Sequence, residues 1–193
     1  DTTFKAIFEP EDYHVTIQAN NPVMGSLNYA TGMYAYGTQL YITAAPNPGY
    51  TIEGWEYQPS AGTSATVAYN VQALDHDTVF QVNFKPIQYM VTTYVADGDG
   101  SVSPSASPVD YQGTLTVTAT PGAGKSFKFW KIGDQVVSPD AVFTYTHTTV
   151  GTVRLDAYFA DQVYRVRTAT NGSSLGEVTG AGQYEYNDVA EIT

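Results

Sequence analysis

A repeat of 75 residues is the feature of this sequence that most constrains its fold. Tyr36, Tyr111 and Tyr186 open three similar segments and lie 75 residues apart each time. The same offset relates Trp55 to Trp130, so the two full copies share aromatic positions as well as strand openings. An internal repeat of this length indicates one small structural unit used several times. We therefore expect tandem modules rather than one large domain.

The phase of the repeat follows from segments that recur at its beginning and its end. A strand opening in Tyr recurs at Tyr13, Tyr89 and Tyr164, and the closing segment Asp77–Phe84 resembles the first residues of the chain, Asp1–Phe8. We therefore predict four parts. They are the closing strand of a preceding repeat over residues 1–12, complete repeats over 13–87 and 88–162, and the first half of a further repeat over 163–193.

Apolar residues alternate with polar ones over short stretches that glycine and proline separate. A period of two is typical of a strand with one buried face. The alternating sets are Val15, Ile17, Ala19; Leu40, Ile42, Ala44; and Phe80, Val82, Phe84 in the first copy, and Val91, Thr93, Val95; Leu115, Val117, Ala119; and Leu155, Ala157, Phe159 in the second. We predict an all-β fold with five or six strands per repeat.

One stretch fits two kinds of structure. Val67, Val71 and Leu74 within residues 65–74 would line one face of a helix, and the same residues also suit a strand. The counterpart in the second copy, 142–146, has a strand pattern. We therefore prefer a strand.

Composition argues against several classes of partner and of chemistry. The net charge is -11, which works against binding to a phosphate backbone. The chain has no cysteine, so it has neither disulfides nor thiol chemistry. No apolar run of about 18 residues is present, so we expect no membrane span in this segment.

The segment Ala119–Ser126 fits the relaxed phosphate-loop pattern, which ends in Gly-Lys-Ser. A phosphate loop leads into a helix, whereas the following Phe127–Ile132 has the aromatic content of a strand. The counterpart in the first copy, Ala44–Thr51, lacks the Lys-Ser pair. We therefore expect a turn and no bound nucleotide.

The acidic turn Asp97–Gly100 resembles the start of a calcium loop. A loop of that type has Glu at its twelfth position, and here that position is Pro108. The three histidines, His14, His76 and His147, share no spacing that would suit a zinc site or a catalytic triad. We expect a tight turn, surface histidines, no metal, no cofactor and no catalytic residue.

The tryptophans leave two interpretations open. In regular strands Trp55 and Trp130 would face away from Ile52 and Phe127, and would be exposed for stacking on sugar rings. The alternative, packing between layers or between repeats, is favoured because both copies keep the residue at the same position. The candidate ligand-contact residues are Trp55, Trp130, Tyr29, Tyr34 and Tyr57.

Several motifs together resemble a known family. They are the strand openings in Tyr-x-Val-Thr, the Gly-Ser turns at 25–27 and 100–102, the segments Gly49–Trp55 and Gly124–Trp130, and the closing strand that ends in Phe. The chain resembles, over essentially its whole length, the divergent internalin B-type or Listeria-Bacteroides repeats. The resemblance implies tandem modules of bacterial surface and secreted proteins, each an all-β or β-grasp-like unit. Phe129 departs from the pattern, which has Gly before the Trp, and we interpret the change as a detail of packing.

The function expected from these features is a non-catalytic stalk or spacer with an adhesive role, located extracellularly or at the cell surface. The alternative is a set of carbohydrate-binding accessory repeats of a secreted glycan-active protein. The expected partners are neighbouring repeats and a protein or glycan of a host or cell surface. Strand exchange between chains is a further expectation, in which Phe4 and Phe8 of one chain complete the partial repeat of another.

Overall fold

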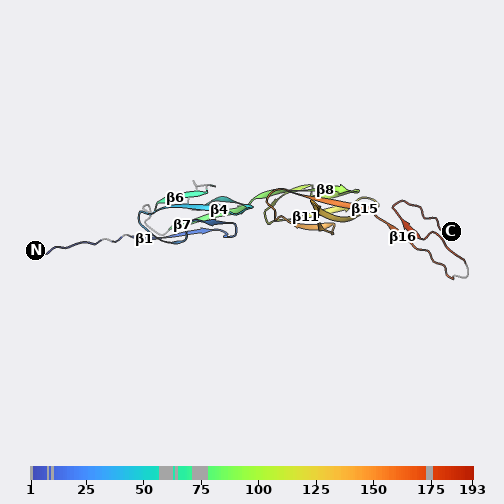
Figure 1. Ribbon diagram of the computed structural model, residues 1–193, viewed down its shortest axis with the longest axis horizontal. Helices are drawn as coiled ribbons and strands as arrows, with labels where there is room; N and C mark the ends of the chain where they lie inside the picture. Colours follow the sequence, from blue (N-terminus) through green and yellow to red (C-terminus); the bar gives the residue numbers. More distant parts are fainter. Residues whose placement is uncertain are drawn as a thin grey trace. The chain divides into compact units, whose positions relative to one another are not determined.

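The computed structural model describes residues 2–7, 9, 11–56, 63, 65–70, 78–172 and 176–193, for 67–70 the backbone only. The chain divides into two compact units, Asp1–Ile87 and Gln88–Thr193 (Figure 1). The described residues form strands and turns and contain no helix, so the all-β prediction is confirmed. A β-grasp would add a helix across the sheet, and the described residues do not supply one.

The first unit contains two sheets. Its strands are β1 (Asp12–Ala19), β2 (Gly25–Leu27), β3 (Gly32–Ala35), β4 (Gln39–Pro46), β5 (Tyr50–Trp55), β6 (Thr66–Asn70) and β7 (Thr78–Pro86). The larger sheet has the order β3-β1-β7-β5 and the smaller one the order β2-β4-β6.

The second unit repeats this arrangement and adds a hairpin strand, β13. Its strands are β8 (Gln88–Asp97), β9 (Gly100–Ser103), β10 (Ala106–Asp110), β11 (Thr114–Pro121), β12 (Lys125–Ile132), β13 (Gln135–Ser138), β14 (Val142–Thr146), β15 (Val153–Asp161), β16 (Tyr164–Val166) and β17 (Gly182–Tyr184). The larger sheet is β10-β8-β15-β12-β13, the smaller is β14-β11-β9, and β16 pairs with β17.

The first and last strands of each repeat lie side by side in the larger sheet. β1 pairs in parallel with β7, with Ile17 opposite Phe80. β8 pairs in parallel with β15, with Thr93 opposite Leu155. A parallel pair joins strands that are distant in sequence, so each repeat is complete only when its last strand is in place.

Each unit has one apolar core between its two sheets. In the first unit it contains the predicted inner residues of β1, β4 and β7, among them Val15, Leu40 and Phe80. The second core is built largely from equivalent positions, and it includes Val91, Val117, Leu155 and Phe159. One predicted inner residue, Val95, is 37% exposed instead. The reason is a register shift in which Ala157 faces Val95 while the next residue, Tyr158, faces Asp97.

Glycine begins the second strand of each repeat because the last strand's phenylalanine lies against it. A Cβ built on Gly25 would lie 2.5 Å from Cζ of Phe84, and one on Gly100 would lie 2.6 Å from Cζ of Phe159. The Gly-Ser segments were predicted as turns, and that prediction was wrong, since they form β2 and β9. Their glycines serve close packing rather than turning of the chain.

The stretch that suited both a strand and a helix forms strand β6 over Thr66–Asn70, paired with β4. Residues 71–74 lie outside the described residues. The predicted number of strands, five or six, was too low: seven and eight are described in the two complete repeats. The short edge strands β2, β3 and β13 account for the difference, since three or four residues carry too little alternation to stand out in the sequence.

Candidate functional site

The two tryptophans belong to the cores. Trp55 is 5% exposed and Trp130 is 0% exposed. Each lies beyond a bulge, between Ile52 and Gly54 in β5 and between Phe127 and Phe129 in β12. The extra residue brings the tryptophan to the same side of the sheet as the apolar residue before it. The expectation of outward-facing rings rested on regular strands, and it fails because both strands are bulged.

The tyrosines that were grouped with the tryptophans are only partly available. Tyr29 and Tyr34 are half-buried against the first core, with ring centroids 6.5 Å apart. The hydroxyl of Tyr34 donates to the carbonyl of Ala30 at 2.7 Å. Tyr57 lies outside the described residues. Both described tyrosine rings thus contribute to the packing of the first core.

The phosphate-loop pattern lies in the turn between β11 and β12. A strand, Lys125–Ile132, follows the turn, as the sequence predicted. The ammonium group of Lys125 bonds the Asp161 carboxylate, and this hydrogen bond is the main cause that lowers the pKa of Asp161 and raises that of Lys125. The turn therefore has neither the helix nor the unpaired lysine of a phosphate site.

The acidic turn and the histidines do not gather into a metal site in the described part of the chain. No group of three His, Asp or Glu side chains with metal-binding geometry occurs among the residues that the structure describes. His147 is fully buried, contrary to the expectation of surface histidines, and its Nδ1 lies 3.3 Å from the hydroxyl of Tyr145. His76 lies outside the described residues.

A patch of aromatic and charged side chains covers the outer face of the larger sheet in the second repeat. We call it the aromatic–cationic patch, and it consists of Tyr94, Phe129, Lys131, Arg154, Asp156 and Tyr158. These residues alternate with Trp130, Leu155 and Ala157, which face the core. Strand register sets them in rows, since Tyr94 and Lys131 both lie opposite Asp156.

Rings and cations are in direct contact within the patch. Nζ of Lys131 lies 5.1 Å from the ring centroid of Tyr158 and 5.4 Å from that of Phe129. Cζ of Arg154 lies 4.3 Å from the ring centroid of Tyr94. Nε of Arg154 donates to Oδ1 of Asp156 at 2.7 Å. Each such contact favours this placement of the cation by about 0.5–1 kcal/mol at an exposed site.

The same face of the first repeat has different chemistry. Gln18 donates from Nε2 to Oε1 of Gln81 at 2.8 Å. Asn83 and Gln81 both donate from their amide nitrogens to Oε1 of Glu56, Asn83 at 3.1 Å. The first repeat thus presents a network of amides and one carboxylate where the second presents rings and cations.

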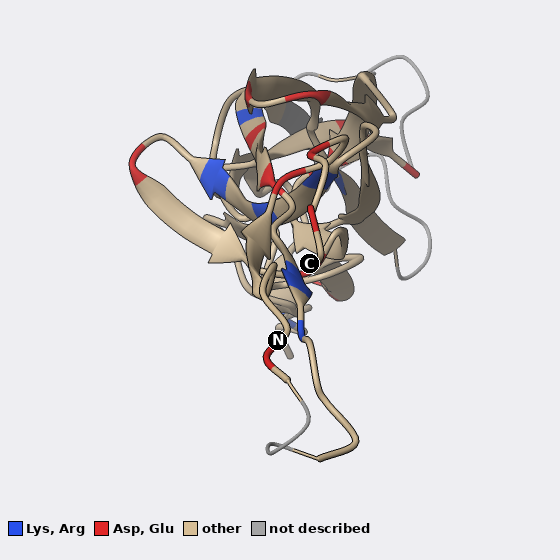
Figure 2. Ribbon diagram, turned by 90° about the vertical axis from the view of Figure 1, so that its right-hand side faces the viewer, with Lys and Arg blue, Asp and Glu red and all other residues tan. Residues whose placement is uncertain are grey.

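Some equivalent positions of the two repeats carry opposite charges. With the repeat offset of 75, Glu53 and Glu56 correspond to Lys128 and Lys131, while Gly54 corresponds to Phe129. Figure 2 marks the chain's few Lys and Arg in blue and its more numerous Asp and Glu in red. This face was not predicted from the sequence. The sequence feature that could have indicated it is Phe129, which replaces the Gly that the family pattern has before the Trp. We interpreted this change as a detail of packing, but the Phe129 ring lies on the outer face, with its centroid 5.1 Å from that of Tyr158.

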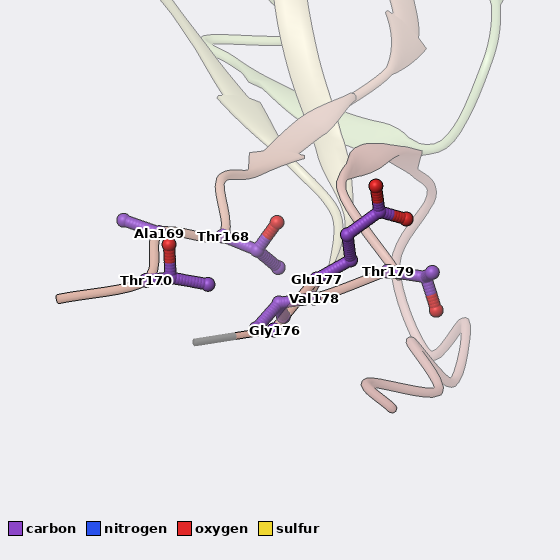
Figure 3. A pocket seen from close by; sticks show the side chains of 7 residues that line it. All are labelled: Thr168, Ala169, Thr170, Gly176, Glu177, Val178 and Thr179. Atoms are coloured by element: carbon purple, nitrogen blue, oxygen red, sulfur yellow. The ribbon is translucent and has the colours of Figure 1, made fainter. Parts of the chain in front are cut away.

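Depressions in the surface occur along the partial repeat. One of about 450 Å³ is lined by Thr168, Ala169, Thr170 and residues 176–179 (Figure 3). Its single charged side chain is that of Glu177. The chain segment beside it, 173–175, lies outside the described residues, so the depression supports no assignment of a site.

Comparison with known proteins identifies the repeats. The family described as divergent InlB B-repeat domain matches residues 14–88 and again residues 89–162. Searches of curated proteins and of solved structures found no significant match. In the described part of the chain no helix has the length and apolar character needed to cross a membrane. The two matches account for well over half of the sequence, and they coincide with the two structural repeats, so the chain belongs to the divergent InlB B-repeat family.

Proposed function

We propose that this chain is a non-catalytic repeat region of a bacterial surface or secreted protein, and that it combines a spacer role with adhesion through the outer faces of its larger sheets. One observation carries the proposal: the two repeats keep the same core but present opposite chemistry on that face. Shared cores are what tandem spacer modules require. Aromatic and charged residues on an outer face are typical of a surface that binds a partner, and here they differ between the two repeats.

Short connections support the spacer role. β7 ends at Pro86 and β8 begins at Gln88. In the first unit the N–H of Ile87 donates to the carbonyl of Gly49, and in the second that of Gln162 donates to Gly124, each at 2.8 Å. Each bond ties the segment that leaves a repeat to a turn of the same repeat, which leaves little free chain.

A distance measurement tests the spacer role. Spin labels at residues 41 and 116, equivalent and exposed strand positions of the two repeats, should give a narrow distance distribution in pulsed electron resonance. Inserting four residues, Gly-Ser-Gly-Ser, after Ile87 should broaden it, since a flexible linker relaxes the constraint. A broad distribution in the unaltered chain would contradict the role.

The partners proposed for adhesion are proteins or glycans of a host or cell surface, with an extracellular or cell-surface location for the chain. The alternative is a carbohydrate-binding accessory role beside a glycan-active domain, and the rings of the aromatic–cationic patch favour it. Screening the 193-residue chain on glycan and extracellular-protein arrays tests both roles. A protein ligand would support adhesion, a glycan ligand would support either role, and no ligand on either array would contradict both.

Strand exchange is the proposed mode of self-association for this 193-residue chain. Residues 2–7 correspond in sequence to the start of β7. Phe4, named in the prediction, is 93% exposed and Ile7 is 81% exposed, while Phe8 lies outside the described residues. The sequence counterpart of β1 in the partial repeat is 164–170, of which Tyr164–Val166 form strand β16 and 168–170 line the depression of Figure 3. We expect dimers at high concentration in light scattering that a Phe4→Asp variant does not form. A monomer at all concentrations would overturn this mode.

A further inference from the structure

We propose that the aromatic–cationic patch of the second repeat binds the sugar units of an anionic polysaccharide. This inference rests on the adhesive part of the proposed function and names the class of ligand. The sugar rings stack on the aromatic side chains, while their carboxylate or sulfate groups meet the cations.

The rings of the patch are placed for stacking. Tyr94 is 48% exposed, and the rings of Phe129 and Tyr158, half-buried, lie side by side with centroids 5.1 Å apart. The sheet holds these rings on three adjacent strands, β8, β15 and β12. Phe129 and Tyr158 form one pair of rings, while Tyr94 lies in a different register row, opposite Asp156. The face thus offers two separate apolar surfaces to a chain of sugars, whose C–H faces pack on aromatic rings.

The cations lie among these rings and are held there. Lys131 contacts Phe129 and Tyr158, and Arg154 contacts Tyr94. Both cations keep donors free for a ligand, because an ammonium group has three N–H bonds and a guanidinium five, of which Asp156 accepts one from Arg154. An acidic group of a stacked sugar would meet these donors at the edge of the ring.

Charge complementarity selects an anionic ligand. The whole chain has a net charge of -11 and only 8 Lys and Arg, yet β12 alone carries Lys125, Lys128 and Lys131, and β15 beside it carries Arg154. One of these four, Lys125, is paired with Asp161. The other three outnumber the two remaining carboxylates on the neighbouring strands, Asp156 and Asp97, which lies opposite Tyr158. They form a local positive surface within an acidic protein.

A polysaccharide suits this surface better than a nucleic acid or an acidic peptide does. A nucleic acid presents one phosphate per nucleotide and needs an extended track of cations, which an acidic chain would oppose. An acidic peptide would pair with the cations but would leave the three rings without a function. Sugars that carry spaced acidic groups use both parts of the patch.

The chain itself supplies a matched variant for the test. Lys128→Glu, Phe129→Gly and Lys131→Glu together give the second repeat the residues that the first repeat has at these positions. A control variant, Lys5→Glu with Lys85→Glu, changes the net charge equally at exposed lysines outside the patch. A second patch variant, Lys131→Gln with Arg154→Gln, removes the two cations and keeps all three rings. It tests the patch even if the triple variant does not fold. Circular dichroism checks that each variant is folded.

Calorimetric titration of the 193-residue chain with four polymers, and with a single-stranded oligonucleotide, completes the experiment. Polygalacturonate and dextran sulfate carry carboxylates and sulfates on sugars, dextran is neutral, and polyglutamate has the charge without sugar rings. We expect binding of one or both anionic polysaccharides, weakened about tenfold or more in both patch variants, as the loss of two charged contacts implies. The control variant should bind nearly as well as the unaltered chain, and dextran and polyglutamate should bind at least tenfold more weakly.

Four results would overturn the inference. They are no binding of either anionic polysaccharide, equal binding of polyglutamate, tighter binding of a single-stranded oligonucleotide, and equal losses in the patch and control variants. If the chain binds components of the protein or glycan arrays and the patch variants still bind them, the inference fails while the proposed adhesion stands. If no array component is bound, the adhesive role itself fails, and the spacer role is judged by the distance measurement alone.

Discussion

Glu56 and Lys131 occupy the same place in the two repeats and carry opposite charges. Each follows the buried tryptophan of its repeat, and each lies on the outer face opposite an equivalent residue of the last strand. In each repeat the neighbouring side chains suit the charge of this residue. Amides of Gln81 and Asn83 donate to the carboxylate of Glu56, whereas ring faces of Phe129 and Tyr158 lie beside the ammonium group of Lys131.

This match predicts a measurable role for the charge of Lys131 in stability. Lys131→Met keeps the length of the side chain but removes the cation from the two rings. We expect the free energy of unfolding in urea to fall by about 0.5–1 kcal/mol, the value of a surface cation–π contact. Lys128→Met is the control, and it should change stability by less than about 0.5 kcal/mol, as is usual for an exposed position. Equal effects of the two changes would contradict the role of the rings.

The contact of Gly100 with Phe159 predicts that alanine is poorly tolerated there. The new Cβ would lie 2.6 Å from the ring and 2.7 Å from the carbonyl oxygen of Thr120, and the backbone oxygen cannot rotate away. We expect Gly100→Ala to lower the free energy of unfolding by about 1–3 kcal/mol, as overpacking does.

Equivalent glycines supply the comparison for Gly100. Gly25→Ala should cost a similar amount, since its Cβ would meet Phe84 and the carbonyl of Ala45 at 2.5 and 2.8 Å. Gly32→Ala meets only Tyr34, at 4.0 Å, and should be tolerated far better. Chemical denaturation of the three variants would refute the packing argument if Gly32→Ala proved as costly as the other two.

The sequence predicted the core of each repeat well and its outer face poorly, for a physical reason. Alternation at Val15 and Ile17 or at Leu155 and Ala157 is the direct mark of a strand with one face in a core. A bulge breaks that alternation, so the direction of Trp55 and Trp130 could not be predicted from regular strands. The patch joins residues from three strands, and contacts such as Arg154 with Tyr94 depend on register, which no local pattern encodes.

Buried Tyr145 predicts a loss of stability in alkali. Burial raises the pKa of its phenol above the ordinary value, against a smaller opposing effect of a hydrogen bond with Thr149. The neutral phenol is therefore favoured by the fold. Its contribution to stability is complete below the pKa of the unfolded chain, about 10, and is lost as the pH rises through the higher folded pKa.

Tyr145→Phe tests this contribution. At neutral pH the variant should be less stable by about 1–3 kcal/mol, because Nδ1 of buried His147 loses the hydroxyl beside it. Between pH 9 and about 11 the unaltered chain should lose stability more steeply than the variant does. Urea unfolding at several pH values measures both slopes, and parallel slopes would contradict the prediction.

The ion pair of Lys125 and Asp161 predicts that the chain loses some stability at acidic pH. The hydrogen bond and charge of Lys125 lower the pKa of the Asp161 carboxyl. A lowered pKa contributes stability that is present above the unfolded value, about 3.9, and is lost as the pH falls through the folded value. Asp161→Asn should therefore be slightly less stable than the unaltered chain at pH 7, and the difference should shrink as the pH falls below about 3.9 and disappear below the folded pKa. Salt at about 1 M should remove the difference at pH 7, since both groups are exposed. A difference that persists in acid would exclude the ion pair as its cause.

Gly124 predicts a coupling between the second repeat and the segment that follows it. It has a φ of +70°, and a Cβ on it would lie 2.3 Å from Cβ of Tyr186. Gly124→Ala therefore adds the strain of a left-handed residue, about 1–2 kcal/mol, and also displaces Tyr186. Gly133 separates the two effects, since it has a φ of +55° but nothing within 4 Å of its Cβ position. Both alanine variants should unfold at lower urea concentration, and only Gly124→Ala should shift the ring resonances of Tyr186 in NMR spectra. Equal shifts in the two variants would mean that strain alone, and not the contact, connects this turn to the following segment.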